Sequence, residues 1–332
     1  MRDIARLAGV NQSTVSRVLS STADASISTT VRRKIIRISR RLDYFRNPSA
    51  VALRTGSTNT MLVVISDITD TWYSSIISGI EEVLVAAGYT MILLSLQYTP
   101  TRGRLDEAFH QYRLDGALLL GALPGLKDRD IRELARRRVP LMLVGRTLGE
   151  PAVASVTVDN GAGGRLAAAH LWGLGHRRIA AMRGPRGWPD LVNRLAGFRR
   201  ELARLGLGPG SLDIFPCASR EAEAAFAAVT SLLERKRPTA LFCINDATAF
   251  GAIRAIRKAG LRVPRDVSVV GFDNAELAPF SDPPLTTVRQ PGREMGRRGA
   301  RELLAAIGEG RSPVSGRLDV DLVVRSSTCP PR

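Results

Sequence analysis

The sequence predicts two folds in one chain: an N-terminal all-α helix-turn-helix unit, and an α/β region of two doubly wound parallel-sheet lobes. The 332 residues exceed one ordinary domain, and 44% of them are hydrophobic, so a sizeable core can be buried. The first 45 residues carry only helix signals. From Met61 onward, short apolar runs alternate with amphipathic helical stretches, and this order predicts parallel sheets with right-handed crossovers.

The N-terminal stretch DIARLAGVNQSTVSRVLS predicts two short helices joined by a tight turn. The first runs from about Asp3, an acidic residue at the positive end of the helix dipole, to Ala8. Gly9 permits the turn, and Asn11 is a suitable N-cap for the second helix. A third helix is expected to follow, from a Ser28 cap to Leu42.

The second and third helices each have an apolar and a polar face. In the second, the apolar stripe is Val15, Val18 and Leu19, and the opposite face carries Gln12, Ser13, Ser16, Arg17 and Ser20. In the third, Val31, Ile35, Ile38 and Leu42 are expected to face the core, and Arg32, Arg33, Arg37, Arg40 and Arg41 to face outward. Hydroxyl, amide and guanidinium groups on a helix that fits the major groove suit contacts with base edges and phosphates.

The distribution of charge favours the DNA-binding interpretation over a small helical subdomain with a solvated polar face. The net charge is +17, which predicts an anionic partner. Residues 1–56 hold 11 Lys and Arg against 3 Asp and Glu, whereas the other 276 residues hold 37 against 28. The charge density is therefore roughly fourfold higher around the helix-turn-helix unit.

The α/β region contains two series of predicted strands. The first series is MLVVIS, TMILLSL, DGALLLG, VPLMLVG and VASVTVD, and the second is RIAAMRG, LDIFPC, ALFCIND and VSVVGFD. Polar residues follow several of these strands, among them Ser66, Asp67, Asn245, Asp246, Asp273 and Asn274. Ligands of doubly wound folds bind beyond the carboxyl ends of the strands, so we expect a ligand site where these residues meet.

Other classes of protein find little support. The three cysteines form no CxxC pair, and His110, His170 and His176 show no metal-ligand spacing, so neither a metal nor another cofactor is expected. The stretch DNGAGGR lacks the P-loop lysine, and Asp159 and Asn160 are better explained as helix caps. No catalytic motif stands out, so an enzyme is not expected. With no secretory signal and no apolar run long enough to span a bilayer, the protein is expected in the cytoplasm.

The motif A-G-V-x-x-x-T-V-S-R-V-L, followed by a basic helix ending in LDY, resembles the headpiece of the lactose-repressor (LacI/GalR) family. The α/β region resembles the same family in order, through DITDTWYSSIISGIE, VTVDN, HLWGLGHRRIA, GP…NRLAGF, PTALFCINDATAFGA, GLRVPRDVSVVGFDN and PPLTTVRQP. An ordered set that covers nearly the whole chain is very specific. Family members usually have several residues before the aspartate matched by Asp3, which suggests a shortened N-terminus, and Asp43 stands where Gly or Asn is usual.

The resemblance implies a headpiece at residues 1–45, a hinge helix or linker at 46–57, and an effector-binding and dimerisation domain at 58–332. By position, Gln12, Ser13 and Arg17 match residues that read bases, and Asn11, Thr14 and Ser16 match residues that contact the DNA backbone. In the hinge, Ala50 matches the small residue that lets two hinge helices approach. Leu53 matches the leucine that opens a minor-groove step.

The family's effector domain is similar to periplasmic sugar-binding proteins, in which the ligand lies between two lobes. The likeness implies one lobe of residues 60–159 and 291–319, and another of residues 160–290 and 320–328. Matching positions imply the effector-binding residues Trp72, Tyr73, Trp188, Asp190, Arg194, Phe242, Asn245 and Asp273. An aromatic face can stack on the C–H surface of a sugar, while Asp, Asn and Arg bind its hydroxyls. The alternatives are that Asp273 is a turn residue, Trp72 a core residue and Arg194 a surface arginine.

Together these features predict a sequence-specific DNA-binding transcriptional regulator, a repressor whose operator affinity is controlled by a small-molecule effector, with a sugar favoured. It is expected to act as a homodimer on a near-palindromic operator. The chain ends in TCPPR without a leucine heptad, so the tetramerising tail of the lactose repressor is not expected. The alternatives are a purine- or nucleoside-responsive co-repressed regulator of the same fold, and a cytoplasmic sugar-binding protein without gene control, against which the basic headpiece argues.

Overall fold

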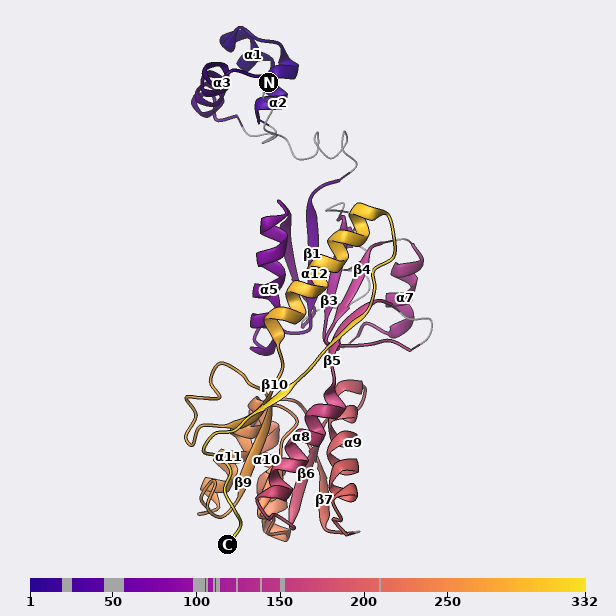
Figure 1. Cartoon of the computed structure of the whole chain (residues 1–332), viewed down its shortest axis with the longest axis vertical. Helices are drawn as coiled ribbons and strands as arrows, with labels where there is room; N and C mark the ends of the chain where they lie inside the picture. Colours follow the sequence, from indigo (N-terminus) through magenta and orange to yellow (C-terminus); the bar gives the residue numbers. More distant parts are fainter. Residues whose placement is uncertain are drawn as a thin grey trace. The chain divides into compact units, whose positions relative to one another are not determined.

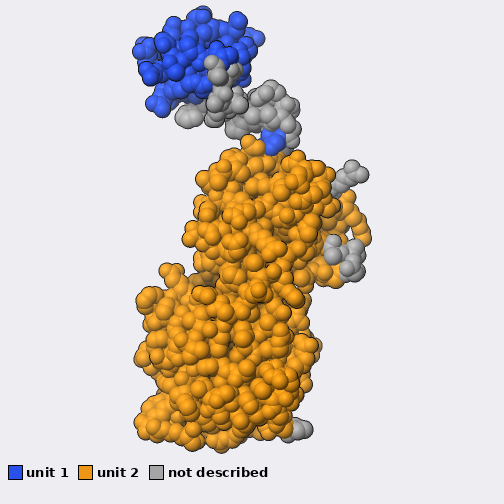
Figure 2. Space-filling model, in the orientation of Figure 1, with its two compact units in different colours: residues 1–58 blue, residues 59–332 orange. Residues whose placement is uncertain are grey.

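The computed structural model describes residues 1–19, 26–44, 57–97 and most of 105–332. The residues that it leaves out of the last range are 106, 110, 112–113, 124, 138, 150–152 and 209. The chain divides into two compact units, Met1–Thr58 and Asn59–Arg332 (Figure 2). The predicted hinge residues Ala50 and Leu53 lie outside the described residues. None of the described helices is long and apolar enough to cross a membrane.

The first unit contains the three predicted helices, α1 (Arg2–Ala8), α2 (Gln12–Leu19) and α3 (Thr29–Arg41). Gly9 ends α1 with a φ of 70°, a left-handed conformation that glycine adopts without strain. The Ser28 side chain caps α3 by accepting a hydrogen bond of 3.3 Å from the amide of Val31. The core between the helices is formed by Ile4, Ala5, Ala8, Val15, Val18 and Ile35.

The end of α3 differs from the prediction. Leu42 was expected in the core, but it is 44% exposed. The helix ends at Arg41, and the backbone reverses at Asp43, which has a φ of 47°. The amide of Tyr44 then donates to the carbonyl of Ser39 over 2.9 Å, and Tyr44 packs against the core. After the reversal Tyr44, and not Leu42, packs against the core.

Lobe 1 of the second unit is built on a sheet in the order β11-β5-β4-β3-β1-β2, in which every strand pair is parallel. Its strands are β1 (Thr60–Ile65), β2 (Thr90–Ser95), β3 (Gly116–Leu120), β4 (Leu141–Val144), β5 (Ser155–Val158) and β11 (Gly316–Leu318). Two helices, α5 (Trp72–Ala86) and α12 (Gly292–Glu309), cover one face, and α7 (Asp128–Arg136) packs on the other (Figure 1).

Lobe 2 repeats this plan, with a sheet in the order β12-β10-β9-β8-β6-β7. Its strands are β6 (Ile179–Arg183), β7 (Leu212–Pro216), β8 (Ala240–Phe242), β9 (Ser268–Asp273), β10 (Thr286–Arg289) and β12 (Asp321–Val323). Only β12 runs antiparallel among the strand pairs described. The helices α8 (Asn160–Gly173) and α9 (Pro189–Arg204) cover one face, and α10 (Ala222–Arg235) and α11 (Asp246–Lys258) the other (Figure 1).

The chain passes from one sheet to the other after β5, after β10 and after β11. At the first passage Asp159 caps α8, because its Oδ1 accepts a hydrogen bond of 2.7 Å from the amide of Ala162. The capping predicted from the glycine-rich stretch is thus confirmed. The sequence did not predict β11, whose three residues contain a single apolar side chain. Each sheet therefore combines segments that lie far apart in the chain.

The helices α8 and α9 are in backbone contact through glycine. A Cβ at Gly164 would lie 2.0 Å from the carbonyl oxygen of Arg194, and a Cβ at Gly197 would lie 2.1 Å from that of Gly161. No residue with a side chain fits at either distance without a shift of the backbone. This approach brings Arg194 close to the start of α8.

We expect Gly164→Ala to lower the free energy of unfolding by about 1–3 kcal/mol, because the added methyl group must push α9 away from α8. Urea unfolding of the full chain measures this change. Gly173→Ala is a matched control in the same helix, because nothing lies within 4 Å of a Cβ there. It is expected to be neutral or to stabilise by about 0.5–1 kcal/mol. Equal destabilisation by both variants would contradict the helix contact.

Candidate functional site

The outer side of α2 carries the polar residues that the sequence singled out. Gln12, Ser13 and Arg17 are exposed, and Thr14 and Ser16 are half-buried. Just before the helix lies Asn11, which is exposed. Its backbone carbonyl accepts a hydrogen bond of 3.0 Å from the amide of Thr14. The opposite side of α2 contributes Val15 and Val18 to the core. The helix therefore presents hydroxyl, amide and guanidinium groups to the outside, as the predicted DNA interface requires.

A second candidate site lies where the two lobes of the second unit face each other. A cavity of about 870 Å³ is bounded by residues of both lobes. Lobe 1 contributes Asp70 and Trp72, and lobe 2 contributes Asn245, Asp273 and Gln290. Three of these five residues belong to the predicted effector-binding set. We call the space between the lobes around these residues the interlobe cleft.

Arg194 is the most constrained of the predicted residues. Its side chain is 2% exposed, and its Nη1 donates to the carbonyl of Ile244 over 2.6 Å and to Oδ1 of Asp273 over 3.3 Å. Its Nε donates to Oδ1 of Asn160 over 2.8 Å, and its guanidinium lies 3.7 Å from the ring centre of Phe272. Burial lowers the pKa of Arg194 below its usual value, although the neighbouring carboxylates of Asp273 and Asp190 act to raise it. Arg194 is therefore a buried, paired cation and not a surface arginine.

Asp273 stands at the end of β9 with a φ of 112°, a left-handed region that non-glycine residues rarely adopt. Besides Arg194, its Oδ1 accepts a hydrogen bond of 2.6 Å from Nε2 of Gln290. Burial raises the pKa of Asp273 to about 6, although Arg194 and Arg220 act to lower it. Asp190 completes the group, with its Oδ2 3.8 Å from Nη2 of Arg194. These residues form a connected charged wall of lobe 2.

The aromatic pair occupies two different environments in lobe 1. Tyr73 is almost fully buried, and its hydroxyl is 2.8 Å from Oγ of Ser66. Trp72 is half-buried and meets Tyr73 edge-on, with ring centres 5.0 Å apart. The indole of Trp72 packs on Gly145, where a Cβ would lie 2.4 Å from the ring. Trp72 borders the interlobe cleft, and the buried ring of Tyr73 packs against the indole of Trp72.

Two predicted residues make structural contacts in lobe 2: Phe242 lies in the core, and Asn245 caps a helix at the edge of the cleft. Phe242 is fully buried and its ring stacks on Phe198 with centres 4.4 Å apart, so it lies in the core of lobe 2 and not on the cleft wall expected from the sequence. Asn245 caps α11, because its Oδ1 accepts a hydrogen bond of 2.9 Å from the amide of Thr248. Its Nδ2 donates to the carbonyl of Arg220 over 3.1 Å. Both polar ends of the Asn245 side chain therefore hold loops of the protein.

The structure also brings in three charged residues that the sequence analysis missed: Asp70, Arg146 and Arg220. Nη1 of Arg220 lies 3.4 Å from Oδ2 of Asp70, and this ion pair joins lobe 2 to lobe 1. Arg146 is largely buried and is bonded to Asp128 over 2.7 Å. Each of the three follows the carboxyl end of a strand, β1, β4 or β7. The position of polar residues just after strand ends, which identified the other cleft residues, could therefore have identified these three as well.

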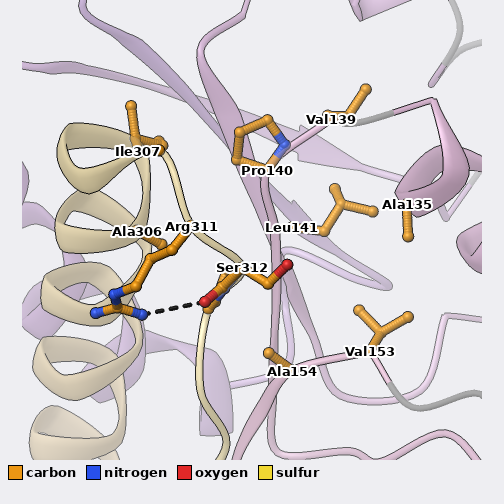
Figure 3. Close-up of a pocket in the computed structure, with 12 residues that line it drawn as sticks. Ala135, Val139, Pro140, Leu141, Val153, Ala154, Ala306, Ile307, Arg311 and Ser312 are labelled. Atoms are coloured by element: carbon orange, nitrogen blue, oxygen red, sulfur yellow. Dashed lines mark hydrogen bonds between the residues drawn. The ribbon is translucent and has the colours of Figure 1, made fainter.

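A separate cavity of about 600 Å³ lies in lobe 1, away from the cleft. Figure 3 shows Val139, Pro140 and Leu141 on one side of it, and the end of α12 with Ala306 and Ile307 on the other. Among the described residues that line it, the charged one is Arg311, which is bonded to Glu302 and Glu309. The described part of the wall thus offers few groups to a polar ligand. Among the described residues, no cluster of His, Cys, Asp and Glu could hold a metal ion.

A helix-turn-helix unit followed by a two-lobed α/β unit with a charged interlobe cleft defines a class of ligand-binding transcriptional regulators. Comparison with known proteins agrees with this class. A family model described as bacterial regulatory proteins of the lacI family matches residues 1–47, and a model for a periplasmic binding protein-like domain matches residues 168–328. The chain is 34% identical to the HTH-type transcriptional regulator DegA of Bacillus subtilis (strain 168), over 99% of this chain and 97% of the relative. It therefore belongs to the LacI family.

Further relatives agree. The chain is 33% identical to the HTH-type transcriptional repressor CytR of Escherichia coli (strain K12), over 99% of this chain and 96% of that protein. A solved complex of the transcriptional regulator CelR with cellobiose matches with a TM-score of 0.74 at 33% identity, and covers 98% of each chain. A Lac repressor dimer bound to operator and the anti-inducer ONPF matches with a TM-score of 0.84 at 29% identity, again over 98% of each chain. The chain is a helix-turn-helix transcriptional regulator.

Asp246 borders the cleft, and the pKa of its carboxyl is unusual. It is buried, and its carboxylate accepts hydrogen bonds from the Thr287 hydroxyl (2.5 Å) and the Ala275 amide (2.6 Å). Burial, with the charge of Asp273, raises the pKa of Asp246 to about 7. The native state therefore binds this proton more tightly than the unfolded chain. The stability contributed by Asp246 is fully present below the unfolded pKa, about 3.9, and is lost as the pH rises to about 7.

We expect Asp246→Asn to flatten the decline of unfolding free energy between pH 5 and pH 7, because the amide cannot titrate. One proton contributes a slope of at most about 1.4 kcal/mol per pH unit. Urea unfolding at pH 5, 6, 7 and 8 measures it, and Asp319→Asn, at an exposed position, should keep the wild-type slope. An unchanged slope in Asp246→Asn would show that the carboxyl of Asp246 does not titrate in this range.

Proposed function

We propose that this protein is a cytoplasmic repressor without enzymatic activity, whose affinity for a near-palindromic operator is controlled by a small molecule bound between the two lobes. The observation that carries the proposal is the interlobe cleft. One cavity is lined by Trp72 of lobe 1 and by Asp273 of lobe 2, which is paired with the buried Arg194, in a chain that also contains the helix-turn-helix unit. A ligand that contacts both lobes can favour one lobe arrangement, and only such unequal affinity can change DNA binding.

For the DNA contacts, we propose a headpiece of residues 1–45 and a hinge of residues 46–57, joined to an effector domain of residues 58–332. Gln12, Ser13 and Arg17 would read bases, and Asn11, Thr14 and Ser16 would hold the DNA backbone. Ala50 and Leu53 would act at the hinge. The exposure of the α2 side chains and the net positive charge of residues 1–56 support this assignment.

For the effector, we favour a sugar or a sugar derivative. Trp72 and Trp188 offer apolar faces for C–H groups, and Asp190, Arg194 and Asp273 suit oxygen atoms of a polyol. Similar regulators have been solved with cellobiose and with ribose. A purine or nucleoside acting as co-repressor is the second candidate, because the same two indoles suit a flat base.

The test is operator binding by the full chain, measured by fluorescence anisotropy on DNA selected from a random library. A panel of sugars, sugar phosphates, nucleobases and nucleosides is first screened by thermal shift, since a ligand at a hundred times its Kd should add about 2.7 kcal/mol of stability. We expect one hit to change operator affinity. Asp273→Ala should lose that response but keep DNA binding. Arg17→Ala should keep ligand binding but lose about 1–3 kcal/mol of operator affinity. No selected operator, or no ligand that alters operator affinity, would contradict the proposal.

We also propose that a homodimer forms through an apolar patch of lobe 2. Phe280 is 80% exposed and Leu277 is 61% exposed, and with Phe250 and Ile253 they border a hollow of about 390 Å³. Large exposed apolar side chains gathered in one place mark protein–protein contacts. A symmetric pair would place two headpieces on the two operator half-sites.

We expect Phe280→Asp to produce a monomer, because a buried unpaired carboxylate opposes association. Light scattering coupled to gel filtration gives the mass directly. Val314→Asp changes another exposed apolar residue outside the patch and should leave the dimer intact. A dimer that survives Phe280→Asp would place the interface elsewhere.

A further inference from the structure

Arg220 is a buried cation with an incomplete set of partners. It follows β7, and its side chain is 11% exposed. Its Nη1 makes the ion pair of 3.4 Å with Asp70, but its Nε is buried and has no hydrogen-bond partner within the described part of the chain. Leaving a buried guanidinium donor unpaired is costly, so such a group points to an acceptor that is supplied from outside the chain.

The surroundings of Arg220 keep its guanidinium charged and shield it from water. Its guanidinium lies 4.7 Å from the ring centre of Trp188 and 5.8 Å from that of Trp72, so an indole of each lobe flanks it. Burial acts to lower the pKa of Arg220, but the carboxylates of Asp70, Asp273 and Asp190 outweigh it and raise the pKa above its usual value. A charged donor that water reaches poorly makes stronger hydrogen bonds than an exposed one.

The chemistry of the free donor selects the ligand group. The Nε and Nη2 atoms of arginine form a planar edge that donates two parallel hydrogen bonds to the oxygens of a carboxylate or a phosphate. A neutral hydroxyl accepts only one of these and carries no charge. Since Asp70 contacts Nη1, it does not occupy that edge. The edge therefore suits an oxyanion better than a neutral polyol.

We propose that Arg220 binds an anionic group of the effector, a carboxylate or a phosphate, through its Nε edge, in competition with its ion pair to Asp70. This inference rests on the proposed function of the cleft as the effector site, and it narrows the effector to sugar acids, sugar phosphates or nucleotides. Two buried arginines, Arg194 and Arg220, lie beside the carboxylates of Asp70, Asp190 and Asp273. An anion at the Nε edge thus shares the positive charge of Arg220 with the carboxylate of Asp70, which contacts Nη1.

The competition has a structural consequence. Asp70 belongs to lobe 1 and Arg220 to lobe 2, so their ion pair links the lobes across the cleft. An anion held by Arg220 weakens the hold of Arg220 on Asp70. The Oδ1 atom of Asp70 also accepts a hydrogen bond of 3.0 Å from the amide of Trp72. A weaker ion pair at Asp70 therefore also affects the start of α5. The ligand's charge is thereby connected to the relative position of the two lobes.

The experiment measures the affinity of the full chain by titration calorimetry for matched anionic and neutral ligands. The pairs are gluconate and glucose, glucose 6-phosphate and glucose, ribose 5-phosphate and ribose, and a nucleoside monophosphate and its nucleoside. We expect at least one anion to bind ten or more times tighter than its neutral partner. Comparison of the gluconate pair with the phosphate pairs shows whether the Nε edge of Arg220 prefers a carboxylate or a phosphate. If no anion binds, or the neutral partners bind as tightly, the proposal is overturned.

Two variants separate recognition by Arg220 from a structural role. Arg220→Lys keeps the charge but lacks the planar edge, so it should weaken the preferred anion at least tenfold and leave the neutral partner unchanged. Asp70→Asn keeps an acceptor for the Trp72 amide but removes the competing charge, so it should tighten the anion several-fold. Arg235→Lys changes an exposed arginine of α10 and is the control. Weaker or unchanged anion binding by Asp70→Asn would overturn the competition, even if Arg220→Lys fails to fold.

Operator binding distinguishes this inference from the proposed function. An anion that binds through Arg220 without altering operator affinity would confirm the inference and count against effector control. A neutral sugar that alone binds and alters operator affinity would overturn the inference and leave effector control standing.

Discussion

The buried guanidinium of Arg194 is the constraint on which the cleft depends. A charge that is 2% exposed is tolerated only when it is paired and fully hydrogen-bonded. Arg194 meets this condition by binding the carbonyl of Ile244 after β8, Asp273 at the end of β9 and Asn160 at the start of α8. Two strand ends and two helices are thus held around one side chain. The cleft wall of lobe 2 is fixed because none of these partners can move without exposing an unpaired charge.

Behind the cleft, a pair of helices packs backbone to backbone in each lobe. In lobe 2, Gly164 lets α8 approach the backbone of α9 at Arg194. In lobe 1, a Cβ at Gly79 would lie 2.0 Å from the carbonyl oxygen of Arg293, so α5 and α12 are equally close. The helices α5 and α9 begin at the cleft, with Trp72 at the first position of α5 and Trp188 just before α9. Tight packing behind the cleft therefore decides where the two indoles stand.

The local structure and the class of protein could be predicted from the order of residues along the chain. Gly9, the Ser28 cap and the Asp159 cap act within a few residues, so the helix ends that they define could be predicted and were found. Hydrophobic periodicity predicted the alternation of strands and helices for the same reason. The polar residues after strand ends marked the cleft, because parallel strands bring their carboxyl ends to one edge. The order of motifs along the chain identified the family.

Which side chains are buried, and what they contact, depends on how the elements pack together. Leu42 fits the apolar stripe of its helix, yet a backbone reversal at Asp43 packs the half-buried Tyr44 against the core and leaves Leu42 exposed. Phe242 lies at the end of a strand near the cleft, but its ring turns into the core against Phe198. The ion pair of Asp70 with Arg220 joins residues that no local pattern connects. Burial and pairing depend on neighbours far along the chain, so periodicity and spacing cannot specify them.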